Sequence, residues 1–120
     1  MYFEFQQQAR HATWSPTVDV CERKDEIVIF VEMPGVSPSD VQIAWNDGLL
    51  IISGLKRQQG ADENVANYLC VERTYGHFRR ELSIKIPVDQ TRAKAKMKDG
   101  LLKIQLPKRQ EADITIIPIG

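Results

Sequence analysis

The chain has 120 residues, which favours one domain with a single hydrophobic core. Its 16 basic and 16 acidic side chains give a formal net charge of zero, which excludes the electrostatic footprint of a protein that binds nucleic acid or an anionic membrane. Two cysteines do not make a disulfide framework, no stretch approaches the roughly 20 apolar residues of a membrane span, and residues 1–6 lack the features of a signal peptide. We therefore expect a cytoplasmic protein without nucleic-acid or membrane partners.

Short strands separated by turns are predicted from residue 17 onward. Residues 17–21 alternate, residues 23–26 form a charged hairpin turn, and residues 27–31 are a β-branched run with apolar side chains on both faces. Such a run is typical of a strand in the middle of a sandwich, where the N-terminal segment or a neighbour covers its second face. Pro34 and Gly35 end this strand.

Two hairpins use the same turn chemistry. Residues 41–45 lead into Asp47-Gly48, and residues 93–98 lead into Asp99-Gly100. Asp-Gly supplies the positive φ angles that a two-residue turn needs, so we expect Gly48 and Gly100 at hairpin turns. Each preceding strand has one face of small or apolar side chains, which are Val41, Ile43 and Trp45 in the first and Ala93, Ala95 and Met97 in the second.

Between the hairpins lie a long polar segment, residues 56–67, and two further predicted strands. Residues 68–71 are predicted as a strand, and residues 78–86 as a strand that Pro87 ends. Arg80 falls on the apolar face of the second strand, so its guanidinium must find acceptors or solvent, and we expect a structural or interface ion pair there. The long segment is either a mobile surface loop or a functional one.

The components of an enzyme are missing from the sequence. His11 and His77 have no second histidine and carboxylate at metal or triad spacing, and the glycines stand singly at turns. Cys21 and Cys70 are flanked by apolar residues, which favours buried, inert thiols. We expect no catalysis, no metal and no cofactor.

Residues 95–119 resemble a known family. Ala95, Asp99-Gly100, Leu102 and Leu106-Pro107-Lys108 are similar to the signature of the α-crystallin domain of small heat-shock proteins, and Ile117-Pro118-Ile119 is similar to the Ile-x-Ile tail of that family. Further segments match in order, namely Trp14-Ser15-Pro16 with Val18-Asp19-Val20, Met33-Pro34-Gly35-Val36, residues 47–54 and residues 72–80. The resemblance therefore runs from about Trp14 to Ile119.

This resemblance implies an all-β, immunoglobulin-like antiparallel β-sandwich at residues 14–108, between a short N-terminal arm at 1–13 and a C-terminal tail at 109–120. It also implies that the long loop carries a strand that pairs with an edge of a second subunit. Trp14, Tyr68, Leu69 and Arg80 are then expected at the dimer interface. The tail anchors Ile117 and Ile119 are expected in a groove of a neighbouring subunit that is formed by Val41, Ile43, Ala95 and Met97.

The function that the resemblance implies is that of an ATP-independent holdase chaperone. It would work as a strand-exchanged homodimer or higher homo-oligomer, bind unfolding client proteins and suppress their aggregation, with the arm residues Tyr2, Phe3 and Phe5 offering aromatic contacts. Alternatives remain open. The tail could fold back on its own domain, Ile114 and Ile116 could replace Ile117 and Ile119 as anchors, and the chain could be a monomeric, cochaperone-like adaptor with one dedicated protein partner.

Overall fold

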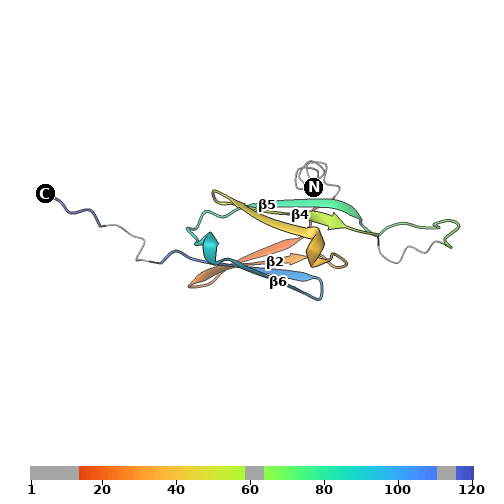
Figure 1. Ribbon diagram of the computed structural model, residues 1–120, viewed down its shortest axis with the longest axis horizontal. Helices are drawn as coiled ribbons and strands as arrows, with labels where there is room; N and C mark the ends of the chain where they lie inside the picture. Colours follow the sequence, from red (N-terminus) through yellow and green to blue (C-terminus); the bar gives the residue numbers. More distant parts are fainter. Residues whose placement is uncertain (1–13, 59–63, 111–115) are drawn as a thin grey trace.

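The computed structural model describes residues 14–58, 64–110 and 116–120, and these ranges form two antiparallel sheets packed face to face (Figure 1). The four-stranded sheet has the order β1 (Val18–Glu22), β2 (Glu26–Glu32), β7 (Leu101–Pro107) and β6 (Lys94–Lys98). The three-stranded sheet has the order β3 (Val41–Asn46), β4 (Leu49–Lys56) and β5 (Gly76–Ser83). Two short 3₁₀ helices, η1 (Pro38–Asp40) and η2 (Gln90–Arg92), lie in the connections. The predicted all-β sandwich is confirmed.

The core lies between the inner faces of the two sheets. β2 and β7 pair so that Ile27 lies opposite Leu106, Ile29 opposite Ile104 and Val31 opposite Leu102, and all six are buried. The three-stranded sheet contributes Leu50, Ile52 and Phe78 from the other side. Alternation with a period of two therefore produces the inner face of each sheet, as the sequence pattern indicates.

The second face of β2 is also apolar. Val28 points away from the core and is nevertheless completely buried, with Cys21 of β1 and Gln105 of β7 as its cross-strand neighbours. Phe30 on the same face is half-buried. The N-terminal arm, predicted as a possible cover for this face, lies outside the described residues.

Both Asp-Gly pairs form two-residue turns with positive φ at each position. Asp47 and Gly48 have φ angles of 46° and 87° between β3 and β4, and Asp99 and Gly100 have angles of 53° and 77° between β6 and β7. This is the conformation of a turn whose twist matches that of the flanking strands.

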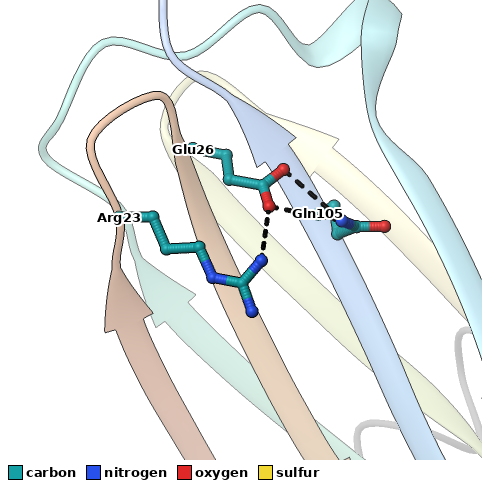
Figure 2. A network of polar contacts seen from close by, with 3 residues as sticks. All are labelled: Arg23, Glu26 and Gln105. Carbon is teal, nitrogen blue, oxygen red and sulfur yellow. Dashed lines mark hydrogen bonds and ion pairs between the residues drawn. The ribbon is translucent and has the colours of Figure 1, made fainter.

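A polar network closes the β1–β2 turn (Figure 2). The guanidinium of Arg23 donates to the Glu26 carboxylate at 3.0 Å, and the Gln105 amide donates to the same carboxylate at 3.3 and 3.5 Å. The carboxylate thus joins the predicted charged hairpin to β7, because Gln105 lies on that strand.

Two predicted strands differ from the structure. β5 ends at Ser83, and Ile84 leaves the strand to donate its backbone N–H to the carbonyl of Gly48. Residues 68–71, predicted as a strand, pair with none of the described strands and are exposed in the connection between β4 and β5. A short apolar run is not sufficient for a strand when no neighbouring backbone receives its hydrogen bonds.

Candidate assembly surfaces

An apolar groove of about 250 Å³ opens between the two sheets on the side where β3 lies near β6. Its walls are Ile43, Ala44 and Trp45 of β3 and Ala93, Lys94 and Ala95 at the start of β6, with Gln90 of η2 at one end. Leu50, Ile104 and Leu106 contribute to the lining from the core. The small side chains of Ala93 and Ala95 leave room that larger residues would fill.

Two of the four residues predicted for this groove line it, Ile43 and Ala95. Val41 and Met97 lie on the same two strands but pack against the core outside the groove. Trp45 was not predicted in the groove, although its alternation with Ile43 places both on one face. Leu50 and Leu106 were not predicted there either, because only the packing of one sheet on the other brings their strands to the same place.

A capping interaction holds η2 beside the groove. The Asp89 carboxylate accepts hydrogen bonds from the hydroxyl of Thr91 at 2.5 Å and from its backbone N–H at 3.1 Å. The side-chain hydrogen bond is the main reason why the pKa of the Asp89 carboxyl lies below its ordinary value. The cap keeps Gln90, the next residue, at the end of the groove.

The described part of the tail is exposed. Ile117 is 82% exposed, Ile116 is 87% exposed, and Ile119 is completely exposed. Figure 1 shows residues 116–120 away from the sandwich. These residues therefore do not pack on their own domain in this structure, in contrast to the alternative in which the tail folds back. Ile114 lies outside the described residues.

Strand β1 forms a sheet edge with incomplete cover. Among the described strands it pairs with β2 alone, so its other backbone edge has no sheet partner. Val18 and Val20 are on the inner face, since they lie opposite Val31 and Ile29, yet Val20 is 50% exposed. An open edge with an exposed apolar side chain is a surface on which another strand can add.

The loop at 57–75 carries further exposed apolar side chains. Leu69 is completely exposed and Val71 is 62% exposed. Arg57 fixes the start of the loop through two hydrogen bonds to Asp40, at 2.9 and 3.1 Å, and these bonds together with the charge of Asp40 raise the pKa of the guanidinium. Tyr68 accepts a hydrogen bond of 2.9 Å from Gln58 across the loop.

The comparisons with known proteins agree on one family. A model of the Hsp20/alpha crystallin family matches residues 19–119. This chain belongs to that family. Small heat shock protein C4 of Rickettsia felis is 34% identical over 88% of this chain, which spans 64% of that protein, less than two thirds of its length.

Solved structures of the family have the same fold. Heat shock protein 16.0 from Schizosaccharomyces pombe has a TM-score of 0.75 and 36% identity, over 89% of this chain and 97% of that chain. A small heat-shock protein from Xylella fastidiosa has a TM-score of 0.76 and 28% identity, over 91% of this chain and 99% of that chain. The two-sheet architecture above is therefore the α-crystallin domain.

Trp14, predicted at the dimer interface of this α-crystallin domain, packs within its own chain. Its indole N–H donates to the carbonyl of Gly76 at 3.1 Å, and its ring lies 5.0 Å from that of Phe78. Ser15 adds a hydrogen bond of 3.0 Å to the carbonyl of Arg79. Residues 14 and 15 thus lie along β5 and link the start of the domain to that strand.

Arg80 lies on the inner face of β5, where it is opposite Ile52 and in line with Phe78. It is half-buried, and the ion pairs of the described residues do not include it, so the ion pair predicted for Arg80 is not formed among them within the single chain. Arg79 points to the other face, where it pairs with Glu81 at 2.7 Å.

Replacing Arg80 by Ala should lower the free energy of unfolding by about 1 kcal/mol, because a long, half-buried side chain on the inner face of β5 is lost. The variant should also form a weaker dimer. Thermal unfolding and sedimentation equilibrium would measure the two effects. Arg79→Ala is the matched control, since an exposed ion pair contributes little to stability. Equal behaviour of the two variants would contradict the role assigned to Arg80.

The prediction that the cysteines are buried is wrong. Both Cys21 and Cys70 are exposed. Cys21 lies on the outer face of an edge strand, and Cys70 lies in the loop, where its thiol donates to the Glu72 carboxylate at 3.3 Å. Apolar neighbours in the sequence do not bury a residue at a sheet edge or in a projecting loop.

In 14–58, 64–110 and 116–120, no three or more His, Cys, Asp or Glu side chains gather as metal ligands would. No helix within these ranges has the length and apolar character to cross a membrane. Tyr2, Phe3 and Phe5, predicted to contact clients, lie outside the described residues.

Proposed function

We propose that this protein is an ATP-independent holdase chaperone that binds unfolding proteins and suppresses their aggregation. The observation that carries the proposal is a set of open apolar surfaces in one folded domain. These are the groove between β3 and β6, the β1 edge, the loop around Leu69 and the tail isoleucines. Membership of the Hsp20/alpha crystallin family supports the same conclusion.

The functional unit in this proposal is a homodimer formed by strand exchange. Residues 68–71 of one copy pair with β1 of the other and thereby gain the hydrogen-bond partner that they lack within their own chain. The unpaired backbone of β1 and the exposed Val20 support this pairing, as do the exposed Leu69 and Val71. A strand that forms only on assembly would explain why the apolar run at 68–71 has no regular structure in the single chain.

Dimers then assemble through the tail, with Ile117 and Ile119 of one subunit in the groove of a neighbour. Burial of two isoleucine side chains contributes roughly 3–6 kcal/mol before the cost of ordering the tail. One such contact is reversible, whereas many contacts in a closed oligomer hold together through multivalency. The crystal structure of the Xylella fastidiosa relative is described as a distinct high order structure, which supports higher assembly in the family.

Reversible dissociation of the assembly exposes the surfaces that bind unfolding proteins. When a tail or an exchanged strand dissociates, it leaves apolar surface that an unfolding polypeptide can occupy. Binding of this kind needs no nucleotide, since the free energy comes from burial of apolar surface on both partners.

The proposal predicts that the protein suppresses heat-induced aggregation of citrate synthase, followed by light scattering, at about one subunit per client and without nucleotide. Serum albumin at the same mass concentration is the control for crowding. Native mass spectrometry of the same preparation should give a dimer or a multiple of it. A monomeric mass and no protection would instead favour the adaptor with one dedicated partner.

A further inference from the structure

The two cysteines occupy unusual places for this residue type. Free cysteine is among the most buried side chains in folded proteins, yet both Cys21 and Cys70 are exposed in the single chain. One lies on the strand whose edge is open, and the other lies in the loop that we propose to pair with that edge. The pairing of the two segments decides whether the thiols meet.

Alternation places Cys21 on the outer face of β1. Val18 and Val20 lie opposite the buried Val31 and Ile29 and so face inward, whereas Cys21 lies opposite Val28, which faces outward. The outer face of β1 at its open edge therefore presents the thiol of Cys21.

The same argument applies to the loop once it becomes a strand. Leu69 and Val71 then share one face, and Cys70 lies on the other. Burial of the apolar pair requires that Leu69 and Val71 continue the inner face that carries Val20. Cys70 then comes to the outer face, which is the face of Cys21.

The pairing registers that place Cys70 opposite Cys21 also place an apolar loop residue opposite Val20. With Cys70 opposite Cys21, a parallel pairing sets Leu69 opposite Val20, and an antiparallel pairing sets Val71 opposite Val20. One exposed apolar side chain of the loop therefore covers the exposed side chain of β1 in either strand direction. Residues directly opposite on neighbouring strands have Cβ atoms about 4.5–5.5 Å apart, close to the separation of a disulfide.

The partner is a second copy of this chain. β1 has no second strand partner among the described residues, and Figure 1 shows the loop projecting beyond one end of its own sandwich. In a symmetric dimer the contact occurs twice, so each copy presents one Cys21 and one Cys70.

We propose that a peroxide joins Cys21 of one copy to Cys70 of the other and so locks the exchanged dimer. One thiolate attacks the peroxide, the O–O bond breaks, and a sulfenic acid and one water form. The second thiol then attacks the sulfenic sulfur, the S–S bond forms and a second water leaves. Two thiols and one hydrogen peroxide thus yield one disulfide and two waters. The inference rests on the proposed function, because it needs the strand-exchanged dimer.

The test treats the full chain with hydrogen peroxide and separates the products on a non-reducing gel. We expect a covalent dimer that dithiothreitol reverses, and that is lost in both Cys21→Ser and Cys70→Ser. Co-expression of the two variants should restore it, since one Cys21 then meets one Cys70. On hundredfold dilution the oxidised protein should stay dimeric while the reduced protein dissociates.

A covalent dimer that persists in either single variant would overturn the inference, because it would show pairing of identical cysteines. The mass of the reduced protein before dilution distinguishes failure of the disulfide from failure of the proposed dimer. A reduced dimer that forms no cross-link with peroxide would overturn the disulfide and leave the proposed function intact, whereas a reduced protein that is already monomeric before dilution would overturn both.

Discussion

A chain cut after Arg109 should assemble no further than the dimer, while its sandwich remains folded. Arg109, the first residue of the tail, is still held by the domain, because its N–H donates to the carbonyl of Pro87 at 3.2 Å and that of Lys108 donates to the carbonyl of Asp25 at 2.8 Å. The cut removes Ile117 and Ile119, and none of the described residues that it removes is buried. Multi-angle light scattering would show the loss of mass, and an unaltered melting temperature would show that the domain is intact.

Substitutions in the full-length chain separate the two candidate anchors. Replacing Ile117 and Ile119 together by Ser should reproduce the truncation, whereas replacing Ile114 and Ile116 by Ser should leave the mass unchanged. Both variants remove two isoleucines from the same tail, so they are matched in composition. The opposite result would move the anchor to the neighbouring register, and an unchanged mass in the truncated chain would refute assembly through the tail.

Replacing Gly54 by Ala should be severely destabilising, with a loss of roughly 3 kcal/mol or more in the free energy of unfolding. A Cβ at this position would lie 2.2 Å from the backbone carbonyl oxygen of Asp40 and 2.5 Å from the ring of Phe78. Neither neighbour can move freely, because the Asp40 oxygen belongs to the backbone, and Phe78 is completely buried with its ring tilted at 44° against that of Trp14. Urea unfolding followed by tryptophan fluorescence would measure the change.

Two other glycines provide controls for Gly54. Gly120→Ala should have no effect, since no atom lies within 4 Å of the added Cβ. Gly48→Ala should cost about 1–2 kcal/mol, because its φ of 87° strains any other residue although the nearest atom is 3.5 Å away. A Gly54→Ala variant as stable as the unmodified protein would contradict the close packing of β4 against η1 and β5.

Local sequence determined the features that depend on neighbouring residues alone. The Asp-Gly pairs at 47–48 and 99–100 adopt positive φ at both positions, a conformation that few other dipeptides tolerate. Alternation in β2 and β7 decided which side chains face the core. The ordered motifs between Trp14 and Ile119 were sufficient to indicate the family.

Features that depend on distant segments were decided only by the tertiary structure. A strand requires a second backbone for its hydrogen bonds, so the apolar run at 68–71 remains a loop when none of the described strands pairs with it. Cys21 is exposed because β1 ends the sheet, and a single strand does not reveal whether it lies at an edge or in the middle. The groove unites β3 with β6 and with the core residues Leu50 and Leu106, because two sheets stack across segments that are far apart in the chain.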